Sequence, residues 1–308
     1  MKPWLPGLAA ASIGVQVGAA MVATRLVVDQ AGPGSLAMLR YAIGLLCLLP
    51  IIAALRAWPS FARRDVLPIA LLGIGQFALL IALLNFGLAR VPAGRAALIF
   101  AAFPLLTMLV AAASGHEALT WRKSLGVLLS FLGVGIALSE KLLTDLAPAQ
   151  SLDGWIGELA VLAAAFCGAV CSVYTRPYIA RYGALPVGAW AMAASVGFLA
   201  LLALNEGYFA NPWRFDAEAW WVIGFIGLSS GIGYGVWLWA LRHGTPTRIT
   251  QFLSLSPVTA ALLGVVWLGE NLTLPLLLGL GAVLLGLRVA QAPQPGQTAS
   301  NKMSGSKT

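Results

Sequence analysis

The sequence predicts an all-α membrane protein with ten transmembrane helices arranged as two inverted five-helix repeats. Three observations predict this fold class: the composition, the number of long apolar runs and an internal repeat. Of the 308 residues, 59% are hydrophobic and only 10% are charged, whereas soluble domains carry about 25% charged residues. The low charge excludes a soluble enzyme, and the high apolar content excludes a disordered chain.

The membrane-spanning elements are predicted to be helices rather than barrel strands. A helix needs about 20 apolar residues to cross the hydrocarbon core, whereas barrel strands alternate polar and apolar residues over about 10 positions. The sequence contains unbroken apolar runs such as Ile69–Leu84 and Leu274–Leu287. Such runs are typical of spanning helices, in which the backbone groups pair within the segment.

Apolar runs between charged or turn-forming breaks define ten predicted helices. Most connections between them are short. The last residues, 291–308, are rich in Gln, Ser, Gly and Lys, and they predict a disordered cytoplasmic tail. The ten predicted helices cover residues 5–28, 35–55, 66–88, 92–114, 121–140, 155–176, 184–204, 217–241, 246–268 and 272–290.

The distribution of charge predicts that both termini lie in the cytoplasm. With the N-terminus inside, 13 of the 19 Lys and Arg residues fall on cytoplasmic flanks, and nine of the 11 acidic residues fall on the other side. Basic residues are enriched in the cytoplasmic loops of membrane proteins. We therefore expect a multi-pass protein of the cytoplasmic (inner) membrane. The basic residues form no run that could grip phosphates, so we expect no nucleic-acid partner.

A shift of 153 residues aligns two stretches of the chain with each other. The repeats are predicted to cover residues 5–140 and 154–290, with five helices each. Because five is odd, the second copy must enter the membrane from the opposite side, as in many secondary transporters. The matched pairs include Arg95/Arg248, Pro104/Pro257, Glu117/Glu270, Thr120/Thr273, Gly126/Gly279 and Gly133/Gly286.

The doubled pattern Arg-x8-Pro-x12-Glu-x2-Thr, followed by a Gly-rich helix, resembles the EamA domain. The whole chain resembles a ten-helix transporter of the drug/metabolite transporter superfamily, and LAMLRYAIGLL around Arg40 is similar to that family's second helix. The resemblance spans residues 5–290. It implies export or exchange of small metabolites, often amino acids and related compounds, without fixing a substrate. It also implies that the motif residues are structural.

The prolines and the glutamates of the doubled motif each have two alternative roles. Pro104 and Pro257 fall near the middle of helices four and nine, where each removes a backbone donor and bends the helix. The bend is either a fixed kink that shapes a cavity or a hinge that flexes during transport. Glu117 and Glu270 follow the same helices. Their carboxylates are expected to accept N–H bonds at the start of the next helix, and the alternative role is ion coupling.

Polar side chains near the middle of the apolar segments predict a substrate cavity. An amide in hydrocarbon needs a partner or a water-filled cavity, so two glutamines at similar depth favour a polar cavity. For the serines and threonines, interhelical hydrogen bonds are the alternative. The predicted lining residues are Gln16, Gln76, Thr107, Ser229, Ser230, Tyr234, Ser254 and Ser256.

Charged residues are absent from the middle of every predicted helix, and Arg40 and Glu158 come closest to it. A phosphorylated substrate should require central basic residues, and proton coupling should require an intramembrane acid. We therefore expect a neutral or zwitterionic substrate with weak or absent proton coupling. As a hypothesis, Arg40 and Glu158 pair on the outer side and gate the cavity, with Glu158 as the only plausible coupling acid.

The sequence predicts neither an enzyme nor a cofactor. Cys167 and Cys171 share a helix face, but no His or acid lies nearby, so the three cysteines are expected to be packing residues and no metal site is predicted. The motif GLSSG at 227–231 has one downstream His, His243. It lies about 21 Å further along the same helix, which excludes a Ser–His dyad.

We expect a secondary transporter that moves a small neutral or zwitterionic metabolite, such as an amino acid, by alternating access between the two repeats. It is expected to act as an exporter or exchanger, as a monomer or homodimer in the lipid bilayer. The alternative is a non-transporting membrane sensor or assembly subunit on the same fold. A polar cavity between the repeats would favour the transporter, and a dry interface would favour the alternative.

Overall fold

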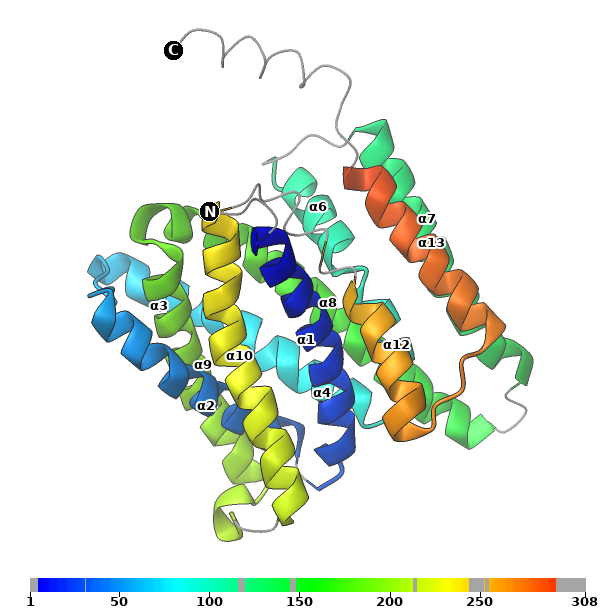
Figure 1. Ribbon diagram of the computed structural model, residues 1–308, viewed down its shortest axis with the longest axis horizontal. Coiled ribbons are helices and arrows are strands. Elements are labelled where there is room, and N and C mark those ends of the chain that lie inside the picture. The colour runs from blue at the N-terminus through cyan, green and yellow to red at the C-terminus, as the bar shows by residue number, and fades with distance from the viewer. Residues whose placement is uncertain are drawn as a thin grey trace, which may run out of the picture.

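The structure is a computed structural model that describes residues 5–30, 32–115, 120–144, 148–212, 215–243, 252 and 255–291. Every regular element within these residues is a helix, and the helices form one bundle (Figure 1). The predicted tail, residues 291–308, falls outside the described residues except for Gln291, which ends the last helix.

The helices of the first repeat follow the predicted segments closely. The second, fourth and fifth predicted segments shift by one to four residues at their ends. The third predicted segment is one span made of three pieces, and the fourth is a pair of short helices. In order they are α1 (Leu5–Val27), α2 (Pro33–Ala54), α3 (Arg63–Gly73), the π-helix η1 (Ile74–Leu79), α4 (Leu80–Leu88), α5 (Ala93–Phe100), α6 (Phe103–Ala113) and α7 (Trp121–Thr144).

The helices of the second repeat differ in length from the equivalent helices of the first repeat. Its first helix begins before the predicted residue 155 and ends after residue 176. The part of the ninth predicted helix that lies at 246–254 is outside the described residues, apart from Phe252. The elements are α8 (Pro148–Tyr182), α9 (Ala184–Asn205), the short 3-10 helix η2 (Tyr208–Ala210), α10 (Ala217–His243), α12 (Leu255–Leu268) and α13 (Leu274–Gln291).

The apolar helices of the described residues include both full-length and shorter membrane segments. Seven helical stretches in the described residues reach spanning length, with α3–η1–α4 and α5–α6 each counted as one. Three shorter apolar stretches lie in α7, α12 and α13. A span needs roughly 20 residues, a length that seven of the stretches reach, and together with the three shorter stretches they confirm the predicted all-helical membrane fold.

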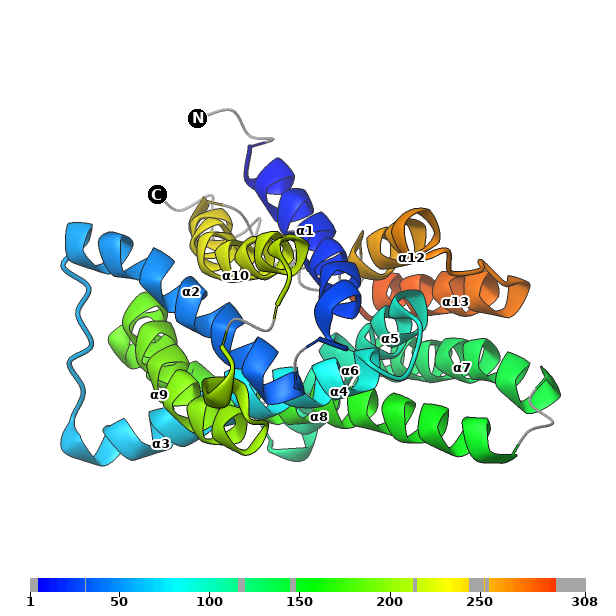
Figure 2. The same ribbon diagram turned by 90° about the horizontal axis from the view of Figure 1, so that it is seen from below.

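The two repeats are intertwined rather than placed side by side as separate lobes. In the first repeat α1 packs against α10 and α12, and in the second repeat α8 packs correspondingly against α4 and α6. The equivalent helices α2 and α9 pack on each other, as do α7 and α13, which lie side by side at one edge of the bundle (Figures 1 and 2). This pairing is what a pseudo-two-fold axis between inverted repeats produces.

Glycines allow the helices of the two repeats to approach closely. Gly44 of α2 lies against Gly231 of α10, where a Cβ atom on Gly231 would be 2.6 Å from the Gly44 carbonyl oxygen. Gly18 of α1 lies against the Ser256 carbonyl of α12, and a Cβ atom there would overlap it. Small residues at such crossings let helix backbones meet in a membrane. The crossing of α2 and α10 sets the position of Arg40 against α10.

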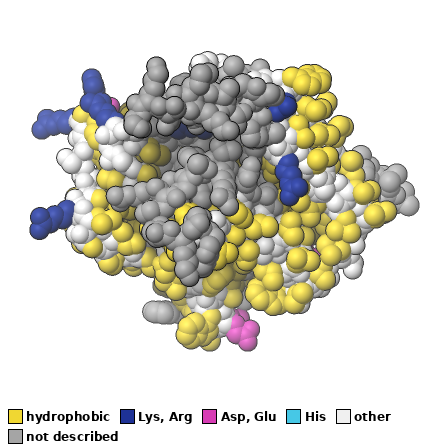
Figure 3. Space-filling model, turned by 45° about the horizontal axis from the view of Figure 1, so that its top comes forward, with side chains coloured by type: hydrophobic (Ala, Val, Ile, Leu, Met, Phe, Trp, Pro, Cys, Tyr) yellow, Lys and Arg dark blue, Asp and Glu magenta, His cyan; other side chains and the backbone are white. Residues whose placement is uncertain are grey.

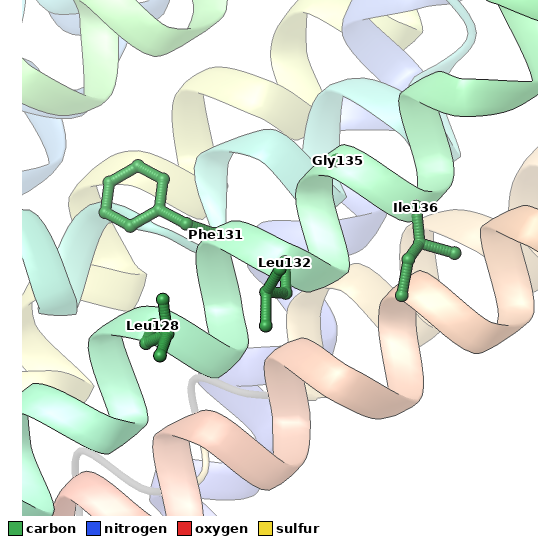
Figure 4. Close-up of a pocket in the computed structure, with 5 residues that line it drawn as sticks. All are labelled: Leu128, Phe131, Leu132, Gly135 and Ile136. Carbon is green, nitrogen blue, oxygen red and sulfur yellow. The ribbon is translucent and has the colours of Figure 1, made fainter.

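The outer surface of the bundle is apolar, as contact with lipid requires. Figure 3 shows hydrophobic side chains over much of the described part of one face. A shallow hollow on this surface is lined only by residues of α7, namely Leu128, Phe131, Leu132, Gly135 and Ile136 (Figure 4). Its apolar side chains are between 39% and 56% exposed. The hollow therefore suits lipid acyl chains rather than a polar metabolite.

Candidate substrate-binding site

Arg40 and Ser230 form the clearest polar contact inside the membrane-spanning part of the bundle. The Nε group of Arg40 on α2 donates a hydrogen bond of 2.7 Å to the Ser230 hydroxyl on α10. The Ser230 hydroxyl in turn donates to the Ile226 carbonyl, one turn earlier, at 2.9 Å. The close crossing at Gly44 and Gly231 brings α2 and α10 near enough for this contact. Arg40 is thereby connected to a residue at the middle of α10.

The predicted pair between Arg40 and Glu158 is wrong. Glu158 on α8 lies 3.4 Å from Arg95 on α5, and its side chain is only 3% exposed. The reason is the packing: α8 lies against α5, whereas α2 carries Arg40 onto α10. Apart from its contact with Ser230, Arg40 has one further interaction, with the ring of Tyr41 at 5.7 Å. The two predicted gate residues therefore belong to different contacts.

Gln16 lies beside the same stretch of α10. Its amide oxygen fills the space left by the missing side chain of Gly233, since a Cβ atom on Gly233 would be 2.6 Å from Gln16 Oε1. Within the described chain, the half-buried Gln16 amide has no hydrogen-bond partner. Ser230 and Gly233 are one turn apart. Arg40 from α2 and Gln16 from α1 therefore approach α10 at nearly one level.

Gln76 belongs to a second polar cluster, around η1. The π-helical segment places the Gln76 amide against α8, where its Oε1 atom accepts a 3.3 Å hydrogen bond from the Ser172 hydroxyl. The neighbouring Gly75 carbonyl accepts a 3.4 Å contact from the Cys167 thiol. Turns of π-helix interrupt the regular hydrogen-bond ladder and often occur at functional sites. The sequence revealed Gln76 but gave no signal for the π-helix.

The other predicted lining residues are less available to a ligand. The Thr107 hydroxyl bonds to the Phe103 carbonyl within its own helix, at 2.9 Å. The Tyr234 hydroxyl bonds to the Ala184 carbonyl at the start of α9, at 3.2 Å. Ser229 is buried, and Ser256 lies in the first turn of α12. Ser254 lies outside the described residues, as do the motif residues Glu117 and Arg248.

The fourth span is interrupted near Pro104. Helix α5 ends at Phe100, a turn follows at Ala101 and Ala102, and Pro104 lies in the first turn of α6. A proline there cannot donate to the preceding turn, which explains the break. Pro257 lies in the first turn of α12 and is buried. These positions leave the fixed kink and the flexing hinge as alternatives.

Glu270 binds the start of a helix, as predicted, but this helix is not the one that follows it in the chain. Its carboxylate accepts hydrogen bonds from the backbone N–H groups of Ala93 at 2.6 Å and Gly94 at 3.1 Å, at the start of α5. We expected the start of the next helix, α13. The loop after α12 reaches α5 instead because α12 packs against α5. A carboxylate at this position offsets the positive end of the helix dipole.

Glu206 makes a matching contact that the sequence analysis missed. Its carboxylate accepts from the backbone N–H groups of Gly34 at 2.9 Å and Ser35 at 2.7 Å, and from the Ser35 hydroxyl at 2.6 Å. Glu206 directly follows α9, which packs on α2. The only sequence signal was that α2 begins with Gly-Pro-Gly-Ser, and its N-cap residue Gly32 supplies no side-chain cap. Both carboxylates thus join the second repeat to helix starts of the first.

The opposite end of the bundle carries a contact between the same two repeats. Asp65 near the start of α3 accepts from Arg181 at 3.0 Å and from the Tyr182 hydroxyl at 2.5 Å, both near the end of α8. Asp65 is only 8% exposed, whereas the Arg181 side chain is 53% exposed, so the pair lies at the boundary between the bundle and solvent. Within the described residues, no group of three or more His, Cys, Asp or Glu side chains could hold a metal ion.

The fold and these contacts define a class of protein, a multi-pass membrane transporter built from two inverted repeats. The model of the EamA-like transporter family matches residues 5–139 and 155–290. The chain therefore belongs to the EamA-like transporter family. It is a membrane transporter and not an enzyme.

Two relatives and one solved structure show what the chain is similar to. A protein of Streptantibioticus cattleyicolor named "Probable terminal-alkyne amino-acid exporter" is 31% identical over 82% of this chain and 81% of its own length. A Salmonella typhimurium protein named "Probable amino-acid metabolite efflux pump" is 28% identical over 76% of this chain and 81% of its own. A crystal structure with 20% sequence identity superimposes with a TM-score of 0.65, covering 97% of this chain and 98% of that chain, which supports the fold alone.

Proposed function

We propose that this protein is a secondary transporter that exports or exchanges small neutral or zwitterionic metabolites of the amino-acid type. The proposal rests on one observation, a cluster of three polar side chains between helices of the two repeats. The cluster consists of Arg40, Ser230 and Gln16. Substrate sites of inverted-repeat transporters lie near the midplane at the repeat interface. The names of the two relatives, both of which refer to amino acids, agree with this substrate class.

The orientation follows from the charge distribution. In this proposal both termini lie in the cytoplasm, and the protein lies in the cytoplasmic (inner) membrane. It acts there as a monomer or homodimer. In this orientation the starts of α2 and α5, with their bound carboxylates, face outward. The contact of Asp65 with Arg181 then faces inward. Each side of the membrane has contacts that join the two repeats.

Alternating access requires these contacts to break in turn. Opening the outer side separates Glu206 and Glu270 from the helix starts they bind, whereas opening the inner side separates Asp65 from α8. The interrupted fourth span at Pro104 supplies the flexing point. Hydrogen bonds to charged groups contribute about 1.5–3 kcal/mol each, which is comparable with the few kcal/mol that separate conformations of a two-state protein.

Uptake into proteoliposomes tests the proposal. Vesicles containing the purified protein are given a panel of labelled amino acids and neutral metabolites, with and without a pH gradient. We expect saturable uptake of at least one amino acid, with little effect of the gradient. Protein-free vesicles are the control. Uptake no faster than in those vesicles for the whole panel would contradict the proposal and favour a non-transporting sensor.

A further inference from the structure

Arg40 is a cation inside the membrane-spanning part of the bundle without an acidic partner among the described residues. It lies seven residues into α2 from Pro33, or about 10 Å along the helix. A guanidinium has five N–H donors, and only the Nε donor is used, in the bond to Ser230. Within the described chain, the Nη1 and Nη2 atoms have no hydrogen-bond partner.

Four other arginines near the membrane have a carboxylate or a backbone carbonyl as a partner. Arg25 donates to the Leu88 carbonyl at 2.6 Å, and Arg90 pairs with Asp153 at 3.0 Å. Arg95 lies beside Glu158, and Arg181 beside Asp65. In each case an oxygen atom with negative charge or strong acceptor character faces an Nε or Nη group. Arg40 instead has a neutral hydroxyl, which itself donates to a backbone carbonyl, and the ring of Tyr41.

This arrangement leaves a positive charge to be balanced. Charged groups in membrane spans are costly and normally pair with one another or face a water-filled cavity. A serine hydroxyl can orient a guanidinium but cannot neutralise it. Because Nε is held by Ser230, the edge formed by Nη1 and Nη2 stays free to bind two oxygen atoms of one anion.

The adjacent Gln16 amide adds a second set of hydrogen-bonding atoms without a partner in the described chain. Its oxygen can accept from an ammonium group, and its nitrogen can donate to a carboxylate. Gly233 gives the amide room to lie against α10, within one turn of Ser230. A single cation with one neighbouring amide matches a carboxylate and its adjacent polar group. A phosphate dianion would call for several basic groups.

We propose that the cluster of Arg40, Ser230 and Gln16 recognises the carboxylate of the transported substrate and the polar group next to it, so that the substrates are zwitterionic acids. Arg40 contacts the carboxylate directly, Ser230 positions the guanidinium, and Gln16 contacts the polar group next to the carboxylate. The inference rests on the proposed function and narrows it. It assigns Arg40 a role in recognition in place of the gate predicted from the sequence. Amides and amines of the same side chain are poor substrates because they lack the anion.

The test compares amino acids with analogues that lack the carboxylate. Leucine, methionine and phenylalanine, together with the amide and the decarboxylated amine of each, are assayed by ligand-induced thermal shift of the purified protein and by proteoliposome uptake. The variants are Arg40→Gln, Arg40→Lys, Ser230→Ala and Gln16→Leu. Arg288→Gln, which removes an exposed arginine at the far end of α13, is the matched control.

We expect the wild type to bind at least one acid ten times more tightly, or better, than its amide and amine. Arg40→Gln abolishes this preference, Ser230→Ala reduces it, and Arg288→Gln retains it. The melting temperature of ligand-free Arg40→Gln stays equal or rises, because an unbalanced charge has been removed. A lower melting temperature in this variant, together with an unchanged preference for the acid, would assign Arg40 a structural role and overturn the inference.

The outcomes separate this inference from the proposed function. If amides or amines are transported as well as the acids, transport stands and carboxylate recognition is wrong. If no compound in the panel binds or moves, the transport proposal fails, and the inference fails with it. If Arg40→Gln does not fold, Ser230→Ala and Gln16→Leu test the inference instead, since both substitutions remove neutral groups and leave the charge of the protein unchanged. Unchanged preference for the acid in these two variants would contradict the inference.

Discussion

At the scale of single residues, four acidic side chains that join the repeats make two kinds of contact. Glu206 and Glu270 bind the backbone N–H groups at helix starts that have no side-chain cap of their own. Glu158 and Asp65 pair with arginines. The first kind joins the repeats through the backbone, and the second through side chains. The two kinds respond differently to substitution by the neutral amide.

Glu206→Gln and Glu270→Gln should each lower the melting temperature of the purified protein. The amide keeps the shape but replaces a charge-assisted bond to a helix start with a neutral one, at a cost of about 1–2 kcal/mol. Asp29→Asn, at an exposed position, is the control and should leave the melting temperature unchanged. Equal stability of all three variants would show that these carboxylates do not hold the repeats together.

Glu158→Gln should destabilise the protein but leave transport independent of pH. The substitution removes the carboxylate beside Arg95, whose side chain is 19% exposed, and breaking a buried pair costs about 3–5 kcal/mol. Uptake per folded molecule, measured across a range of pH, checks the second part. Loss of a pH-gradient response that the wild type shows would instead identify Glu158 as a coupling acid.

At the scale of helices, one close crossing positions the polar cluster and one interruption divides the fourth span. The crossing of α2 and α10 depends on the glycine pair Gly44 and Gly231, and it sets Arg40 against Ser230. The break at Ala101 and Ala102 divides the fourth span. Each feature can be changed by one substitution, with a matched control elsewhere in the chain.

Gly231→Ala should destabilise the protein and weaken substrate binding together. The added Cβ atom would lie 2.6 Å from the Gly44 carbonyl oxygen and 2.7 Å from Cys47 Cβ, and overpacking of this kind costs about 1–3 kcal/mol. Gly224→Ala on the same helix is the control, because nothing lies within 4 Å of its added Cβ atom. Thermal melting and ligand-induced thermal shift measure both effects. Equal behaviour of the two variants would contradict a role for this crossing.

Pro104→Ala should slow transport without unfolding the protein. Alanine restores the backbone donor and favours a continuous fourth helix, so the flexing point is lost. Pro50→Ala is the matched control, since Pro50 also lies inside a helix but is exposed and outside the repeated motif. Initial rates of proteoliposome uptake give the comparison. Unchanged kinetics in Pro104→Ala would leave the break as a fixed kink.

The spans were predictable because they follow local rules, whereas side-chain partners were not. Apolar runs and breaks place helix ends within a few residues, as for α9, predicted at 184–204 and observed at Ala184–Asn205. The partner of Glu270 depends on which helix packs beside α12, and the partner of Arg40 depends on where α2 crosses α10. These contacts join residues 177 and 190 positions apart. No local pattern in a single sequence encodes such distances.

At the scale of the whole molecule, intertwining of the repeats connects the proposed binding site with the outer end of the bundle. Helices α1 and α2 bring Gln16 and Arg40 to α10, and the start of α2 is also held by Glu206. A movement of α2 relative to both α9 and α10 therefore changes the contact with Glu206 and the contact with Ser230 together. This link is what alternating access requires, because the site must be exposed to one side only at a time.

Counterflow in proteoliposomes tests the central claim most directly. Vesicles are loaded with a high concentration of an unlabelled amino acid and diluted into a trace of the same labelled compound. We predict transient accumulation of label in wild-type vesicles above its external concentration, and none with Arg40→Gln. An alternating-access carrier produces this overshoot because the loaded site returns label inward. Absence of accumulation in wild-type vesicles for every amino acid of the panel would contradict the account.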